Sequence, residues 1–307
     1  MNKAYQQGIL FILVYVLLSS AQAVYLSNYF QFSRPEEALF VSFILVVVFF
    51  SLLRIRHFSK LLQKTKESFS LITIFNFVTA GSWFGYFYAI KYLEPAVSKS
   101  ITRGLLPLVT LAFAIPLRPQ AKPLNLEVVA AIGILAGSSF LGVSAFLGHS
   151  SLGEVSSLNL TLGFLAALLS VVSQAGILIC SKKLHEKKWV SSEIMIMRSP
   201  LVILLSFLIL FKNSGLSSIL EIKAVLPLFF VTFAGVIIPL YSLQLGIARL
   251  EPTTTAALIS LEPVITLLMQ LFDSRLKISF QSVIGVCSIS IFAMMAAYAQ
   301  HRFKIRK

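Results

Sequence analysis

The sequence is poor in charged side chains and rich in apolar ones. Only 12% of its 307 residues are Asp, Glu, Lys or Arg, against about 25% in an ordinary soluble domain. Hydrophobic residues make up 57% of the chain, and the mean hydropathy is +0.87. A soluble protein could not cover that much apolar surface with polar groups. The composition therefore indicates an integral membrane protein.

Cysteine, histidine and the common catalytic motifs are also scarce. Cys180 and Cys287 show no spacing that suggests a disulfide or a metal site, and the four histidines fall in predicted loops or tails. No Walker loop, HExxH or GxSxG motif occurs. We therefore expect no cofactor, no enzymatic activity and no ATP hydrolysis by the chain itself.

Long apolar runs are what the sequence does contain. Each could cross about 30 Å of hydrocarbon as a helix, whereas barrel strands would alternate and break such runs. We therefore expect an all-α integral membrane protein with ten transmembrane helices. The runs cover residues 8–30, 37–53, 69–90, 95–117, 127–147, 160–180, 193–211, 224–247, 252–271 and 280–300.

The net charge of +14 would suggest nucleic-acid binding in a soluble protein, but here the basic residues flank the apolar runs. If the N-terminus is cytoplasmic, seventeen Lys and Arg residues lie inside and six lie outside, which is the positive-inside pattern. The charge therefore predicts a multi-pass protein with both termini in the cytoplasm, in contact with the lipid bilayer and not with nucleic acid. A bacterial inner membrane is the expected location.

One short motif occurs twice. Residues 93–95 read Leu-Glu-Pro, and residues 250–252 repeat them 157 positions later. Gln22-Ala23 in the first run likewise returns as Gln174-Ala175 in the sixth. Runs one to five therefore match runs six to ten. Because five is odd, the second set must enter the membrane from the opposite side, which predicts two inverted repeats.

The repeated segments resemble a known family. Residues 250–268 (LEPTTTAALISLEPVITLL) and the segment Glu193 to Pro200, which carries Arg198, are similar to the second repeat of EamA-type members of the drug/metabolite transporter superfamily. The resemblance covers essentially the whole chain and implies EamA-type repeats at 1–150 and 151–307. It also implies a central cavity, lined mainly by the third, fourth, eighth and ninth runs, that opens alternately to the two sides.

Apart from glutamates at the first residue of a run, four charged side chains fall inside the apolar runs, where a charge is costly. Arg103 and Glu262 lie about 12 and 15 Å deep, and we predict that they face the same cavity. Arg103 would bind a substrate carboxylate or another anion, whereas Glu262 would pair with Arg103 or a substrate amine and bind a coupling proton. A purely structural ion pair is the alternative. Lys99 is expected to extend to the outer surface, and Arg198 to orient helices.

Uncharged polar groups and prolines complete the predicted site. Amides in hydrocarbon need partners and should face inward, and Trp83 with Tyr86 could form a wall for a flat ring or a cation. Pro107 and Pro263 are the candidate hinges, whereas Gly133, Gly137 and Gly285 are expected to be close-packing sites. The polar and aromatic candidates for substrate binding are Gln22, Gln174, Asn76, Trp83, Tyr86, Tyr241 and Gln244.

These observations predict a secondary active transporter of a small polar or amphipathic metabolite. Export of an amino acid or a related compound is the leading interpretation, and uptake of a nucleoside-like or cofactor-like solute is the second. A lipid-handling membrane enzyme would need a polar catalytic cluster, which we do not find, and a sensor or scaffold that transports nothing is a further alternative. A monomer and a homodimer both fit the sequence.

Overall fold

The computed structural model describes residues 3–114, 125–147, 155–213, 229, 231–276 and 279–305. Within these ranges the chain is helical and contains no strand, which confirms the expected all-α fold. The predicted boundary between the repeats, at residues 150 and 151, lies outside the described residues. So do residues 115–117 and 224–228, which belong to two of the predicted spans.

Helical segments cover the described part of every predicted span in the first half. An additional short helix, α3, occupies the basic connection after the second span, and η2 is a stretch of π-helix. The segments are α1 (Lys3–Phe32), α2 (Pro35–Arg54), η1 (Ile55–His57), α3 (Phe58–Glu67), α4 (Phe69–Tyr92), α5 (Pro95–Lys99), η2 (Ser100–Gly104), α6 (Leu106–Ala114) and α7 (Asn125–Phe146).

The second half follows the same order, with a break in the helix at the seventh and ninth predicted spans. Its π-helical stretch, η5, lies in the eighth span instead of the fourth. The segments are α8 (Ser157–Glu186), α9 (Ser191–Met197), α10 (Pro200–Asn213), η5 (Phe233–Ile237), α12 (Ile238–Arg249), α13 (Pro252–Ile259), α14 (Glu262–Gln270) and α15 (Phe280–Ile305).

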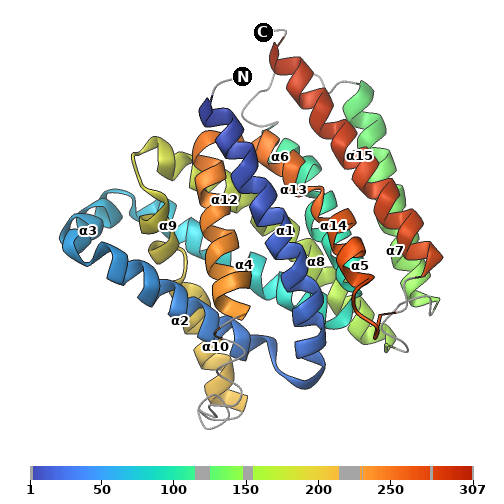
Figure 1. The fold of residues 1–307 in the computed structure, drawn as a ribbon, viewed down its shortest axis with the longest axis horizontal. Coiled ribbons are helices and arrows are strands. Elements are labelled where there is room, and N and C mark those ends of the chain that lie inside the picture. Colours follow the sequence, from blue (N-terminus) through green and yellow to red (C-terminus); the bar gives the residue numbers. More distant parts are fainter. Residues whose placement is uncertain are drawn as a thin grey trace.

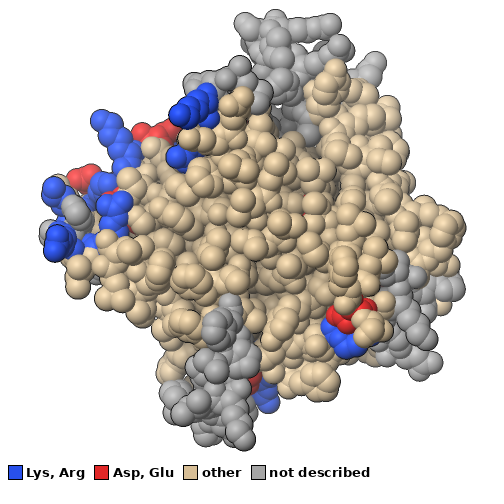
Figure 2. Space-filling model, viewed as in Figure 1, with Lys and Arg blue, Asp and Glu red and all other residues tan. Residues whose placement is uncertain are grey.

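Several helices are long and apolar enough to cross a bilayer, which makes this an integral membrane protein. Large apolar side chains such as Leu52, Phe77 and Phe211 are exposed, as expected for surfaces that face lipid. Figure 2 shows Lys and Arg gathered over α3, whereas the broad middle of that face is free of charge. In the part of the chain that the structure describes, the five stretches with the required length and composition are Lys3–Phe32, Pro35–Arg54, Val128–Phe146, Ser157–Glu186 and Ser191–Lys212.

Helices from the two halves pack against each other in pairs. α4 lies along α8, α1 along α12, α2 along α10, and α7 along α15, the last pair forming one side of the molecule in Figure 1. Glycine permits the close approach of α4 and α8, because a Cβ atom on Gly85 would lie 2.5 Å from the carbonyl oxygen of Ala166. Gly133, Gly137 and Gly285 also contact side chains across the α7–α15 interface, which confirms the predicted close packing.

The repeated Leu-Glu-Pro motif makes equivalent contacts in the two halves. A Cβ atom on Gly163 of α8 would lie 2.9 Å from Cγ of Leu93, and one on Gly8 of α1 would lie 2.8 Å from Cγ of Leu250. Each motif leucine therefore packs on a glycine in the first long helix of the other half. Glu94 is nevertheless buried, whereas Glu251 is exposed, so the two halves differ electrostatically at this position.

Candidate solute-binding site

Two broken helices bring charged residues into the protein interior, the first made of α5, η2 and α6, and the second of α13 and α14. Pro107 has no N–H for the carbonyl of Arg103, and the N–H of Leu105 bonds that carbonyl instead. Pro263 lies in the first turn of α14, directly after the break at residues 260–261. α5 contacts α14, so the two interruptions lie near each other.

Glu262 is the centre of a buried network. Its Oε2 atom lies 2.5 Å from Nζ of Lys99 and 3.3 Å from Nε of Arg103. Lys99 also donates to Oγ of Ser19 at 2.8 Å, and Ser19 donates to Glu262 Oε2 at 3.4 Å. Ser20 donates to the backbone carbonyl of Glu262 at 3.3 Å. The predicted contact between Arg103 and Glu262 is thus present, and α1 completes it.

The aromatic ring of Tyr86 covers the cationic side of this network. Lys99 Nζ lies 4.4 Å from the ring centroid, and Arg103 Cζ lies 5.5 Å from it. Both distances allow a cation–π interaction, which is strongest where water is excluded. The wall predicted at Trp83 and Tyr86, for a flat ring or a cation, thus has two cations of the protein itself at the ring of Tyr86.

The expectation that Lys99 extends to the outer surface was wrong. Its side chain has no exposed surface, because Glu262, Ser19 and the ring of Tyr86 together satisfy the ammonium group in the interior. Lys99 is only four residues from the start of its helix, which suggested a shallow position in the membrane. That spacing could not show that the carboxylate of Glu262, from the other half of the chain, lies within reach.

Several polar atoms around the network are buried and make no hydrogen bond to any described residue. Such atoms are rare in native proteins, and a group of them marks a place where a ligand or water can bind. Their chemistry is mixed, with donors from guanidinium and amide groups and an acceptor from the carboxylate. They include Arg103 Nη1, Glu262 Oε1, Tyr86 OH, Ser98 Oγ and Gln22 Nε2.

The matching amides of the two halves lie at matching interfaces. Gln22 of α1 faces Gly235 of η5, where an added Cβ atom would lie 3.0 Å from Cγ of Gln22. Gln174 of α8 accepts a hydrogen bond from Ser82 of α4 at 3.0 Å. Both amides are buried, as predicted, and each joins the first long helix of one half to a helix of the other.

Asn76 and Trp83 lie on α4 but contact different parts of the interior. The amide of Asn76 donates to the carbonyl of Met197 at 2.7 Å and accepts from the N–H of Leu201 at 3.2 Å, so it bridges the break between α9 and α10. The ring of Trp83 packs edge-on against Tyr86, with 6.0 Å between centroids. Asn76 is therefore not part of the Glu262 network, whereas Trp83 supports one wall of it.

Two predicted site residues on α12 do not join the network. The ring of Tyr241 packs against Phe50 of α2, with 5.2 Å between centroids. Gln244 donates to Ser181 Oγ of α8 at 3.2 Å. These contacts connect α12 to its neighbours, and the structure brings neither side chain to Glu262.

Sequence reasoning missed the contribution of Tyr15, Ser19 and Ser20 on α1. The phenol of Tyr15 is buried on the same helix as the two serines. Tyr15, Ser19 and Gln22 are spaced four and three residues apart, so they share one helix face. Following the helix face of Gln22 two turns toward the N-terminus could have found Ser19 and Tyr15.

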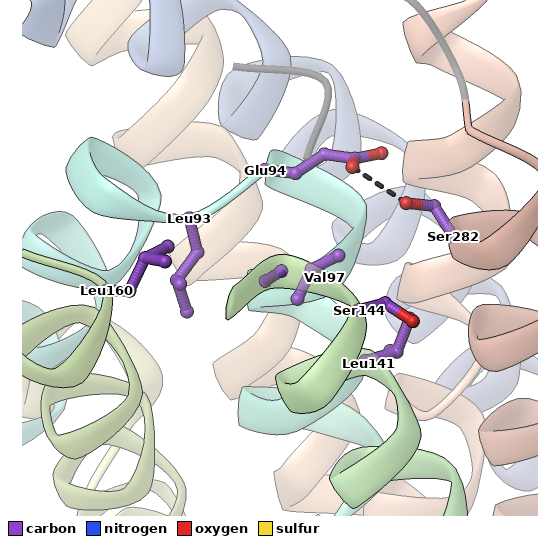
Figure 3. Close-up of a pocket in the computed structure, with 8 residues that line it drawn as sticks. Leu93, Glu94, Val97, Leu141, Ser144, Leu160 and Ser282 are labelled. Atoms are coloured by element: carbon purple, nitrogen blue, oxygen red, sulfur yellow. Dashed lines mark hydrogen bonds between the residues drawn. The ribbon is translucent and has the colours of Figure 1, made fainter. Parts of the chain in front are cut away.

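A small separate pocket lies beside Glu94, at the start of α5 (Figure 3). Ser282 of α15 donates to Glu94 Oε2 at 2.8 Å, and aliphatic side chains including Leu141 and Leu160 form much of the wall. None of the predicted site residues lines it. Among the described residues, no group of three or more His, Cys, Asp or Glu side chains could hold a metal ion.

Comparisons with known proteins agree with this architecture. Among 28 matching chains of solved structures, a crystal structure described only as that of a protein covers 97% of this chain and 99% of its own length, with a TM-score of 0.66 and 18% identity. At that identity the likeness concerns the fold alone. None of the curated proteins matches the chain. Residues 161–298 match the model of the EamA-like transporter family, which is consistent with the predicted resemblance to the drug/metabolite transporter superfamily.

Proposed function

We propose that the chain is a secondary active transporter that moves a small polar or amphipathic metabolite by alternating access. The observation that carries this proposal is the buried network of Lys99, Arg103 and Glu262 where two broken helices meet. Ionisable residues at membrane depth are costly, and they commonly mark solute pathways or proton relays. Transporters also place their substrate sites between repeats, at discontinuous helices.

The proposed architecture is ten membrane spans in two inverted repeats, residues 1–150 and 151–307. The helix pairs support it. α1 and α8 are equivalent helices of the two halves, and so are α4 and α12, so the α4–α8 contact of one half corresponds to the α12–α1 contact of the other. The contact of Leu93 with Gly163 corresponds in the same way to the contact of Leu250 with Gly8. α1 begins and α15 ends at the same edge of the molecule (Figure 1), as expected if both termini are cytoplasmic.

Within this mechanism Glu262 is the proposed coupling site. It could release Lys99 and Arg103 when it takes up a proton, since the neutral carboxyl group no longer attracts the two cations strongly. Pro107 and Pro263 adjoin the two helix breaks and are the proposed hinges. We propose export of an amino acid or a related compound across a bacterial inner membrane, driven by the proton gradient.

Exchange in proteoliposomes tests the proposal. Purified protein would be loaded with a metabolite mixture, and counterflow of labelled solutes would be measured with and without a pH gradient. We expect the wild-type chain to exchange a solute, Arg103→Ala to lose exchange, and Glu262→Gln to lose the response to the gradient. Glu186→Gln is the matched control, because Glu186 is exposed at the end of α8. Wild-type transport by Arg103→Ala and Glu262→Ala would rule out the proposed site.

A further inference from the structure

Arg198 is a buried cation with open hydrogen-bond donors. It is 1% exposed, and neither Nε nor Nη1 has a hydrogen-bond partner among the described residues. Its guanidinium lies over the ring of Phe75, whose centroid is 5.6 Å from Cζ. A buried charge without a counter-charge strongly disfavours the folded state, so a role limited to orienting helices does not explain why this residue is an arginine.

The backbone around Arg198 is fixed in place by other residues. Arg198 ends α9, and Pro200 begins α10. Asn76 bonds the carbonyl of Met197 on one side of this break and the N–H of Leu201 on the other. The backbone that carries Arg198 is therefore held in place from both sides of the break, which a built binding site requires.

Arg198 and the Glu262 network both lie close to helix α1 in the fold. α1 contacts both α4, which carries Phe75, and α14, which begins with Glu262. The ring that Arg198 contacts and the residue at the centre of the network thus lie on two helices that both pack against α1.

The buried charges in this region do not balance. Lys99, Arg103 and Arg198 supply three cations, whereas Glu262 is the carboxylate that pairs with two of them. The other buried glutamates of the described residues contact groups elsewhere. Glu36 accepts from Tyr88, Glu94 accepts from Ser282, and Glu193 pairs with Lys64.

We infer that the transported solute is an organic anion, and that its carboxylate binds to the guanidinium of Arg198. Guanidinium groups bind carboxylates through two parallel hydrogen bonds, and Arg198 has Nε and Nη1 open. The open Nη1 of Arg103 offers a second contact for an anionic or polar group. A dicarboxylate or an acidic amino acid would reduce the excess positive charge, which a neutral zwitterion would leave unchanged. This inference rests on the proposed transport function and narrows its solute class.

Thermal stability and counterflow test the inference with defined probes. Purified protein would be given succinate, glutamate, leucine, lysine, or the inorganic anions chloride and phosphate. We expect succinate or glutamate to raise the melting temperature and to support counterflow in liposomes, because a ligand stabilises the form that binds it. Exchange of leucine or lysine, but not of either organic anion, would overturn the inference while leaving the proposed transport function intact. Stabilisation by chloride or phosphate alone would also overturn it, and failure to exchange any solute would contradict both proposals.

Two variants of Arg198 separate binding from folding. Arg198→Gln should weaken binding of the organic anion by about 30-fold or more, the cost of losing one partner of a buried, hydrogen-bonded charge pair. Arg198→Met should in addition raise the melting temperature of the solute-free protein, because it removes an uncompensated buried charge. Arg56→Gln, at an exposed arginine, is the control. Unchanged anion binding in Arg198→Gln, or a lower melting temperature of solute-free Arg198→Met, would show that Arg198 is structural.

Discussion

Lys99 and Glu262 form an ion pair that connects the two halves of the chain, with 2.5 Å between Nζ and Oε2 and no exposed surface on either side chain. Ser19 bonds both partners from α1. Any motion that separates α5 from α14 must therefore break or replace this pair. Under the proposed mechanism, the solute and the coupling proton are what replace it.

Removing Lys99 should destabilise the protein. Lys99→Met removes the closer of the two cations that pair with Glu262. Breaking a buried ion pair costs about 3 kcal/mol or more of folding free energy. We expect a clearly lower melting temperature in detergent, and a smaller loss in the double variant Lys99→Met/Glu262→Gln. Lys183→Met, at an exposed lysine, should have no effect. Equal melting temperatures for Lys99→Met and Lys183→Met would refute this role for the pair.

Tyr86 should act on stability through its ring and on transport through its hydroxyl. Tyr86→Phe keeps the aromatic face under Lys99 and Arg103 and removes a hydroxyl that has no partner among the described residues. Stability should then change little, while transport falls if the hydroxyl contacts the solute. Tyr86→Leu should lose about 2 kcal/mol from the cation–π contacts alone. The idea fails if Tyr86→Phe and Tyr86→Leu melt at the same temperature.

The glycines under the two motif leucines should tolerate alanine poorly. Gly163→Ala and Gly8→Ala place a Cβ atom 2.9 and 2.8 Å from a leucine Cγ, and such overpacking costs about 1–3 kcal/mol. Gly142→Ala is the matched control, because its nearest neighbour, Phe164 Cζ, lies 3.6 Å away. It should be neutral or stabilising, since alanine favours helix. Similar denaturation curves for all three variants would show that the leucine contacts are not tight.

Asn76 should prove to be structural. Asn76→Ala leaves the carbonyl of Met197 and the N–H of Leu201 without their side-chain partner, at about 1–3 kcal/mol for each buried group left unsatisfied. Thr73→Ala, on an exposed face of the same helix, should change stability little. We expect Asn76→Ala to lower the melting temperature without changing which solutes compete for transport. Altered solute preference at unchanged stability would return Asn76 to the substrate-binding set.

Cysteine labelling tests the membrane arrangement. In a chain with Cys180 and Cys287 replaced by serine, we expect Phe32→Cys to react with a membrane-impermeant maleimide from outside intact cells. Lys183→Cys should react only after permeabilisation, because the two loops lie on opposite sides in the ten-span arrangement. Both side chains are exposed on the surface of the protein. Labelling of both from the same side would disprove inverted repeats.

The sequence alone determined the kind of molecule. Apolar runs long enough to span a bilayer leave helices as the available structure, because backbone groups in hydrocarbon must bond within their own segment. The repeated Leu-Glu-Pro motif indicated the duplication, and the cost of burying charge identified Arg103 and Glu262. These conclusions depend on local composition and spacing, which a single chain displays directly.

Tertiary structure decided which of these groups meet. Lys99 lies near the start of its helix and was expected to extend to the surface, but Glu262 from the other half holds it inside. Asn76 and Gln244 have the same amide group as Gln22, yet their partners lie on other helices, away from Glu262. A buried polar side chain takes its role from neighbours that are distant in sequence, because only their contact replaces the water that it has lost. That contact exists only once the helices have packed.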